Sequence, residues 1–261
     1  MSSAAVDWSR FAPEVEVQVD GAVATVTMNR PEVMNAIDHA QRLRLTEVFG
    51  LLRDDDDVRV VVLAGKGRAF CAGQDQRESA TMDAHGAAGR IEEGIQLLDA
   101  LRGVGKPVIA RIEGHAMGAG LQLALHADLR IAGPAAKFGM TEFKVGSPAI
   151  AGSAALRDII GEAAMKAMVL ECRIIEAPEA LAIGLVNQLV AADAIEARIA
   201  ELAASIAGRA APAVRLTKNW WRAMSEESFQ RTAEQMRRAH SENFSTGSVS
   251  AGAAAFLAKG S

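Results

Sequence analysis

The stretch that decides the fold is VRVVVL at residues 58–63, followed at once by the glycine turn GKGRAFCAGQD at residues 65–75. A continuous β-branched run of this kind is typical of a strand buried on both faces of a parallel sheet. The pattern returns at residues 107–112, PVIARI, which lead into a second glycine turn, EGHAMGAG, at residues 113–120. An apolar helix and a third strand, at residues 128–132, come next, so the order predicts strand–helix–strand crossovers and an α/β core.

A β-hairpin is predicted ahead of these strands. Residues 14–20 alternate apolar and polar side chains, and so do residues 22–28, with an Asp20-Gly21 pair between them. Strict alternation is typical of a strand with one buried face, and an Asp-Gly pair favours a tight hairpin turn. We therefore expect two antiparallel strands at the beginning of the core.

The character of the chain changes near its C-terminal third. Residues 193–208, 212–224 and 226–240 have helical patterns with polar faces, and no strand-like run follows Val190. We therefore predict an α/β core over residues 1–190 and a helical region over residues 191–261. The expected role of this helical region is subunit packing.

Composition and charge argue against several function classes. The chain has 261 residues, with 28 Lys and Arg against 32 Asp and Glu and a formal net charge of −4. Nucleic-acid binders and membrane-surface binders usually carry a basic face, so neither partner is expected. No window is long and apolar enough for a membrane span, and residues 1–10 lack the apolar run of a secretory signal. We expect a cytoplasmic protein in which Cys71 and Cys172 stay reduced.

The two glycine turns are the best candidates for the site of chemistry. The sequence has no G-x-x-x-x-G-K-[ST], no G-x-S-x-G and no Cys/His cluster at metal-ligand spacing, so no metal is expected. Two turns that each follow a buried strand can aim two backbone N–H groups at one point. A fixed pair of donors is what an enolate or a tetrahedral oxyanion needs. The second turn also opens a helix, whose N-terminus favours negative charge.

With these turns in place, the chain resembles the enoyl-CoA hydratase and isomerase family, the crotonase superfamily, nearly from end to end. The blocks that carry the resemblance are MNRP (28–31), NA (35–36), VVVLAG (60–65), FCAGQD (70–75), KPVIA (106–110), GHAMGAG (114–120), ADLRIA (127–132) and FGMTE (138–142). The resemblance implies an α/β fold with a ββα spiral core and a C-terminal helical trimerisation region. It also implies an acyl-CoA substrate, no separate cofactor, and a homotrimer or a dimer of trimers.

The resemblance also assigns roles to four residues. The backbone N–H groups of Gln74 and Ala119 match the oxyanion hole that holds the thioester carbonyl. Hydratases of the family carry two glutamates; the second matches Glu142, but the first falls on Gln122. Hydration needs two groups that move protons, and an amide cannot take a proton from water. One carboxylate suffices to move a double bond, so enoyl-CoA isomerisation is favoured, with hydration or a catalytically silent acyl-CoA-binding protein as alternatives.

The CoA moiety is expected at the turn after the hairpin, near the first glycine turn and under the last helix. The residues that match CoA contacts in the family are Val33, Met34, Ala36, Ala72, Phe256 and Lys259. In relatives the last two often come from a neighbouring subunit. A frayed C-terminal helix is the alternative for these two positions, because the chain ends two residues later.

Two further expectations concern the acyl pocket. Many relatives continue from the glutamate into a Pro-Gly-x-Gly-Gly turn, whereas residues 146–153 read GSPAIAGS, which predicts a bulkier wall near Ile150. His115 lies in the second glycine turn, where it can approach the thioester. The other four histidines are expected to be structural or solvated.

Overall fold

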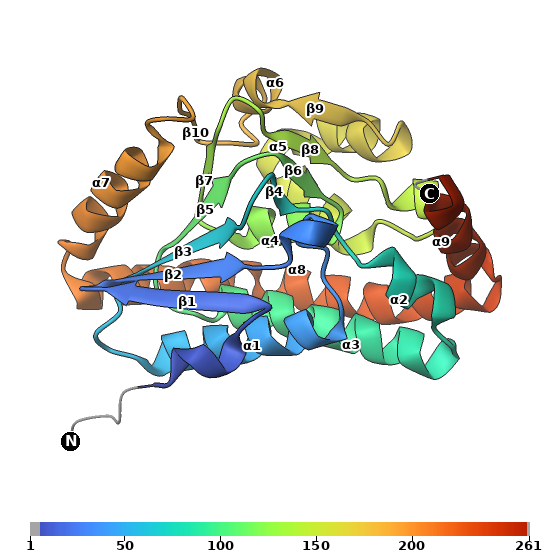
Figure 1. The fold of residues 1–261 in the computed structure, drawn as a ribbon, viewed down its shortest axis with the longest axis horizontal. Coiled ribbons are helices and arrows are strands. Elements are labelled where there is room, and N and C mark those ends of the chain that lie inside the picture. Colours follow the sequence, from blue (N-terminus) through green and yellow to red (C-terminus); the bar gives the residue numbers. More distant parts are fainter. Residues whose placement is uncertain (1–5, 260–261) are drawn as a thin grey trace.

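The computed structural model describes residues 6–259, except for the side chain of Lys259, and its larger sheet has six strands. In spatial order these strands are β1 (Val15–Asp20), β2 (Val23–Met28), β3 (Val60–Gly65), β5 (Val108–Ile112), β7 (Leu129–Ala132) and β10 (Gln188–Leu189). β1 and β2 form the predicted antiparallel hairpin, and every other neighbouring pair is parallel. The hairpin and the parallel core are therefore confirmed (Figure 1).

A second sheet of four short strands lies beside the first. Its order is β4 (Ala69–Cys71), β6 (His115–Met117), β8 (Lys137–Gly139) and β9 (Ile174–Glu176), with β9 antiparallel to β8. The chain therefore passes from a long strand through a glycine-containing turn into a short strand and then into helix. Repetition of this unit produces a ββα spiral, and β4 and β6 lie inside the two segments that the sequence suggested were only turns.

Helices cover both faces of the larger sheet. Alternate residues of β3 belong to two different clusters of buried hydrophobic side chains, because successive side chains on a strand point to opposite faces of the sheet. Val61 and Leu63 pack in the main core, which includes α1 (His39–Asp54) and α3 (Ala84–Arg102). Val60 and Val62 pack against α7 (Ile195–Ala207) on the other face. Burial on both faces explains why β3 is apolar throughout.

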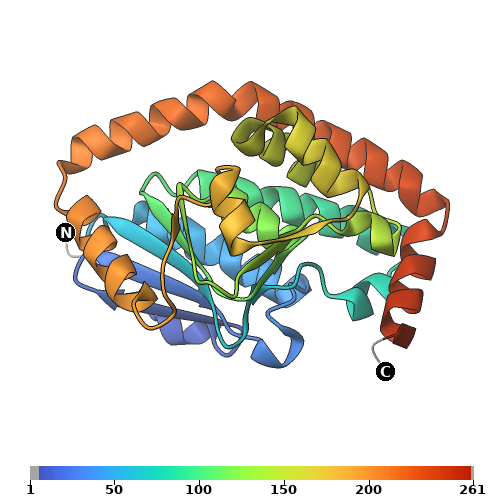
Figure 2. The same cartoon turned by 90° about the horizontal axis from the view of Figure 1, so that it is seen from above.

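The remaining helices connect and flank these layers. They are α2 (Gln76–Thr81), α4 (Ala119–His126), α5 (Ile150–Leu170), α6 (Ala177–Ala182), α8 (Ala211–Ser245) and α9 (Ser248–Lys259), with 3₁₀ helices at Trp8–Phe11, Pro31–Val33 and Glu142–Val145. Figure 2 shows α8 running along one whole edge of the molecule before the chain turns into α9. α8 packs on α3 and α5, whereas α9 packs on α2 and on the 3₁₀ helix at Glu142–Val145. The last helix therefore closes over the segment that carries Glu142.

One prediction about the C-terminal helices is wrong. Residues 212–224 and 226–240 are not two helices but parts of the single helix α8. The polar residues near the expected break do not interrupt it, since the Ser225 hydroxyl donates back to the Trp221 carbonyl within the helix. The boundary between residues 190 and 191 stays a prediction. Within residues 6–259, no helix is long and apolar enough to cross a membrane.

Candidate active site

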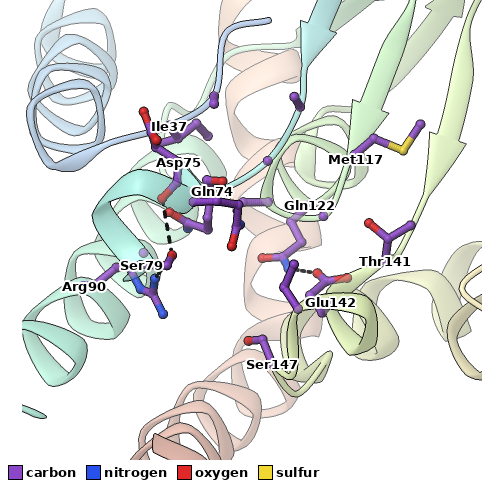
Figure 3. A pocket seen from close by; sticks show the side chains of 18 of the residues that line it. Ile37, Gln74, Asp75, Ser79, Arg90, Met117, Gln122, Thr141, Glu142 and Ser147 are labelled. Atoms are coloured by element: carbon purple, nitrogen blue, oxygen red, sulfur yellow. Dashed lines mark hydrogen bonds between the residues drawn. The ribbon is translucent and has the colours of Figure 1, made fainter. Parts of the chain in front are cut away.

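A cavity of about 580 Å³ lies where the two glycine turns, α3 and α9 meet (Figure 3). All four residues expected to act in catalysis line this cavity, and so do five of the six expected to bind CoA. The sixth, Lys259, ends α9, and its side chain lies outside the described residues. Ile150 and His115 also line the cavity, as their positions in the sequence predicted. The structure thus brings together residues that are separated by more than two hundred positions in the sequence.

The two glycine turns touch each other at the cavity. Gly73 has φ +100°, and a Cβ built there would lie 2.9 Å from the Met117 carbonyl oxygen and 3.6 Å from the Ala119 nitrogen. A Cβ on Gly120 would lie only 2.4 Å from the carbonyl oxygen of Cys71. Contacts this short leave no room for a side chain, so glycine is required at both positions for the close approach. The prediction that the turns converge is confirmed.

Two backbone N–H groups at this junction have no partner among the described residues. Ile37 pairs with the first turn by donating to Gly73 O and accepting from Asp75 N, which leaves the intervening N–H of Gln74 directed away from Ile37. Ala119 is the first residue of α4, and its N–H belongs to the helix N-terminus, where no carbonyl precedes it in the ladder. Neither N–H donates to a described residue. Both are therefore available to an acceptor in the cavity.

Glu142 is the carboxylate beside this pair of donors. It opens the 3₁₀ helix at Glu142–Val145, and a Cβ on Gly118 would lie 3.5 Å from its Oε1. Its Oε2 is sealed from solvent and accepts no hydrogen bond from the described residues. Burial raises the pKa of Glu142 to about 7, against the opposing effect of hydrogen bonds from its own backbone N–H and from Gln122. A carboxyl group with this pKa can both take and return a proton near neutral pH.

Gln122 holds the other oxygen of that carboxylate. Its Nε2 donates to Glu142 Oε1 at 3.1 Å, and Figure 3 shows the two side chains pointing toward each other. The backbone carbonyl of Gln122 accepts from Nδ1 of the half-buried His126 at 2.7 Å, so Nδ1 carries the proton. Burial lowers the pKa of His126 to about 4, which keeps the ring neutral. The amide thus orients Glu142 without adding a second titratable group.

A comparison with models of protein families shows which family the chain belongs to. The model of the enoyl-CoA hydratase/isomerase family matches residues 18–261. The chain belongs to the enoyl-CoA hydratase/isomerase family.

Relatives within this family are similar over most of their length. The (E)-benzylidenesuccinyl-CoA hydratase of Thauera aromatica is 41% identical over 206 residues, which cover 78% of this chain and 80% of that one. A probable enoyl-CoA hydratase of Mycobacterium bovis is 33% identical, covering 93% of this chain and 94% of the relative.

Solved structures of family members share the fold. The crystal structure of an enoyl-CoA hydratase from Mycobacterium avium subsp. paratuberculosis superposes with a TM-score of 0.86 at 26% identity, covering 95% of this chain and 96% of that one. An enoyl-CoA hydratase/carnithine racemase from Magnetospirillum magneticum gives a TM-score of 0.78 at 36% identity, covering 82% of this chain and 81% of that one. The prediction of a crotonase-like α/β fold with a C-terminal helical region is confirmed.

Sequence reasoning missed the polar residues at the α2–α3 end of the cavity in this family member. Asp75, Ser79, Arg90 and His240 all line the cavity, and the first three are buried. Burial acts to raise the pKa of Asp75, but hydrogen bonds from Arg77 and Arg30 outweigh it and hold the pKa below its ordinary value. His240, expected to be structural or solvated, is among the residues that line the cavity. Asp75 ends the FCAGQD block, whereas Ser79, Arg90 and His240 lie outside every block that carries the resemblance.

A signal for one of the missed residues is nevertheless present in the helical pattern. Five of the six buried residues of α3 share one helix face, namely Ala87, Arg90, Leu97, Leu98 and Leu101, whereas Ile95 lies to one side of it. An arginine on the face that carries the apolar side chains must find a partner or a polar cavity, because buried charge is costly without one. The spacing of these residues along the chain therefore singles out Arg90.

Proposed function

We propose that this family member moves protons on an acyl-CoA thioester through an enolate, and that enoyl-CoA double-bond isomerisation is its main reaction. The observation that carries the proposal is the environment of Glu142. It has a raised pKa and a free carboxylate oxygen, and its neighbour in the cavity is the amide of Gln122 rather than a second carboxylate. A single base is what isomerisation requires.

In the proposed mechanism the thioester oxygen lies between the N–H groups of Gln74 and Ala119. The carboxylate of Glu142 removes a proton from the α carbon of a 3-enoyl thioester, and the electron pair moves through the carbonyl to give a dienolate. The two N–H groups stabilise the negative oxygen. Glu142 then returns the proton to the γ carbon, which leaves the double bond between the α and β carbons.

Hydration is the second candidate function, since the relatives at 41% and 33% identity are named hydratases. Water would add its oxygen to the β carbon and a proton to the α carbon. The remaining carboxylate among the described lining residues is Asp75, which is ion-paired with Arg30 and Arg77. Since Gln122 could only orient the water, hydration would leave to Glu142 both proton transfers that two glutamates share in the family's hydratases, which is why isomerisation is placed first.

A comparison of turnover and binding tests whether the chain is an enzyme at all. The purified protein is given 3-hexenoyl-CoA and crotonyl-CoA, and binding of the saturated butyryl-CoA is measured by calorimetry. Formation of 2-hexenoyl-CoA or of 3-hydroxybutyryl-CoA supports an enzyme. Tight binding of butyryl-CoA without turnover of either substrate contradicts it and favours the silent acyl-CoA-binding alternative.

The CoA moiety is proposed to enter past the turn that carries Val33, Met34 and Ala36, next to Ala72. These residues line the mouth of the cavity together with Phe256 of α9, whose side chain is 56% exposed. CoA comes as part of the substrate, so no resident cofactor is proposed. Replacing Phe256 by Ala should raise the Kd for every acyl-CoA alike, because the ring would contact the part that all of them share.

A homotrimer or a dimer of trimers is proposed as the assembly. Four large apolar side chains of α8 are exposed, namely Leu216, Trp220, Trp221 and Met224. Contiguous exposed apolar side chains of this size are typical of subunit interfaces. Sedimentation of the wild type and of Trp220→Glu tests the assembly: the wild type should sediment as a trimer or hexamer and the variant as smaller species. A monomeric wild type would contradict it.

A further inference from the structure

The buried arginines of this protein differ in how their charge is compensated. Three arginines are at least nine-tenths buried: Arg42, Arg90 and Arg130, at 1%, 7% and 7% exposure. Arg42 contacts two carboxylates, at 2.5 and 2.9 Å, and Arg130 donates to three backbone carbonyls. Arg90 has a single hydrogen-bond partner among the described residues. It is therefore the exception to the rule that buried charges are paired.

The single partner of Arg90 is a neutral hydroxyl. Its Nη1 donates to Ser79 Oγ at 2.6 Å, and no described carboxylate oxygen lies within 4.0 Å of its guanidinium. The other two nitrogens donate to none of the described residues. Neither of these nitrogens is sealed from solvent, so both are accessible from the cavity that Arg90 lines. A guanidinium offers a fork of donors that fits a carboxylate.

The surroundings of Arg90 leave its positive charge without a counter-ion of its own. The negative charge of Glu78 acts on Arg90, but both carboxylate oxygens of Glu78 accept hydrogen bonds from Arg42. Burial, followed by the charge of Arg42, lowers the pKa of Arg90, and its guanidinium still stays protonated. His240 lines the same end of the cavity, and burial together with Arg90 lowers its pKa to about 4, so its ring is neutral. Asp75 also lines this end, but its carboxylate is ion-paired with Arg30 and Arg77. Apolar side chains, including Ile91, Leu97 and Met236, line the cavity as well.

Arg90 lies opposite the acid–base end of the cavity. In Figure 3, Arg90 and Ser79 are on one side, Gln122 and Glu142 are on the other, and Gln74 is between them. An acyl group whose thioester oxygen binds the N–H of Gln74 can therefore extend toward either side. We propose that Arg90, supported by Ser79, binds a second carboxylate carried by the acyl group, so that the substrates are thioesters of dicarboxylic acids. This inference rests on the proposed acyl-CoA function.

The test uses matched pairs of saturated thioesters, which bind without reacting. Succinyl-, glutaryl- and adipyl-CoA are compared with butyryl-, valeryl- and hexanoyl-CoA, which have the same chain lengths and end in methyl groups. In the wild type, at least one dicarboxylic thioester should bind roughly 10- to 100-fold more tightly than its methyl-ended counterpart, the range for a buried charge-assisted contact. Arg90→Met should abolish this preference, because it keeps an unbranched apolar stem and removes the charge and the donors.

Two further variants separate charge, geometry and fold. Arg90→Lys keeps the charge but loses the planar fork, so it should retain only part of the preference. Arg237→Met is the matched control, because Arg237 is a half-exposed arginine of α8 that pairs with Glu92 at the surface. It should leave the preference unchanged.

The outcomes that overturn the inference are distinct from those that overturn the proposed function. The inference fails if no dicarboxylic thioester is preferred by the wild type, or if the preference survives in Arg90→Met. An equal loss for both members of a pair would assign Arg90 to CoA binding or to the fold instead. If Arg90→Met does not fold, the wild-type comparison decides alone. Selective binding without turnover would contradict the proposed reaction and leave the carboxylate site intact.

Discussion

The two ends of the cavity carry buried ionisable groups that respond to burial in different ways. Glu142 can become neutral by taking up a proton, and its pKa is accordingly raised to about 7. Arg90 cannot lose its proton at any ordinary pH, so it stays charged with one hydroxyl for a partner. The comparison teaches that burial of a titratable group prepares acid–base chemistry, whereas burial of a permanently charged group prepares binding of a counter-ion.

The largest effect is expected from removing the base. Glu142→Gln should lower the rate of turnover by at least roughly 10²-fold and up to 10⁴-fold, the usual contribution of a positioned acid–base group. The measurement is the steady-state rate with 3-hexenoyl-CoA. The control is Glu113→Gln, the same change at a glutamate that contacts Arg111 at 3.7 Å and does not line the cavity. This control should leave the rate unchanged. Undiminished turnover in Glu142→Gln would mean that another group is the base.

A somewhat smaller loss is expected from removing one oxyanion donor. Ala119 is the first residue of α4, a position where proline is well tolerated, so Ala119→Pro deletes the N–H and leaves the helix intact. The rate should fall by roughly 10²- to 10³-fold. Ala119→Gly keeps the N–H and serves as the control. A rate for Ala119→Pro within a factor of two of this control would exclude Ala119 from the oxyanion hole.

Burial of Glu142 should also make the free energy of unfolding depend on pH. Because its folded pKa lies above the ordinary value of 4.5, the folded state binds this proton more tightly, and stability falls as pH rises from 4.5 to about 7. Above that pH range the free energy of unfolding has fallen by its full amount, roughly 3 kcal/mol for a pKa shift of this size. Glu142→Gln should therefore be more stable than the wild type at alkaline pH and similar to it near pH 4. Denaturant unfolding at both pH values checks this, and equal stability at alkaline pH would contradict it.

The smallest effect is expected from adding a second carboxylate. Gln122→Glu should raise the rate of crotonyl-CoA hydration by about tenfold or more, since it supplies a second group that moves protons. It should also raise the pKa of Glu142 further, because like charges at hydrogen-bond distance disfavour ionisation. The rate is followed as crotonyl-CoA is consumed. A variant that gains no hydratase activity would contradict the view that the missing carboxylate limits hydration.

The acid–base end of the cavity could be predicted from the sequence because short motifs specify it. The glycine turns, the N–H groups of Gln74 and Ala119, and Glu142 lie in such blocks. Gln122 follows the second turn by two residues, on α4. Convergence of the turns follows from glycines that leave no room for a Cβ. Roles for these residues stay predictions until the variants are measured.

The other end could not be predicted in the same way, because its character depends on contacts between distant segments. Arg90 lacks a carboxylate partner because Glu78 pairs with Arg42 instead. Arg42 lies 36 positions before Glu78, on a different helix. The short strands of the second sheet have only three residues each, too few to show a period. α8 likewise packs against α3 and α5, which are distant from it in the sequence.

The ratio of two rates tests the central claim most directly. The wild-type protein is given 3-hexenoyl-CoA and crotonyl-CoA under identical conditions near neutral pH, and isomerisation and hydration are measured separately. With Glu142 as the single base and Gln122 as a neutral neighbour, isomerisation should be the faster reaction. Hydration of crotonyl-CoA faster than isomerisation in the unmutated protein would contradict the account.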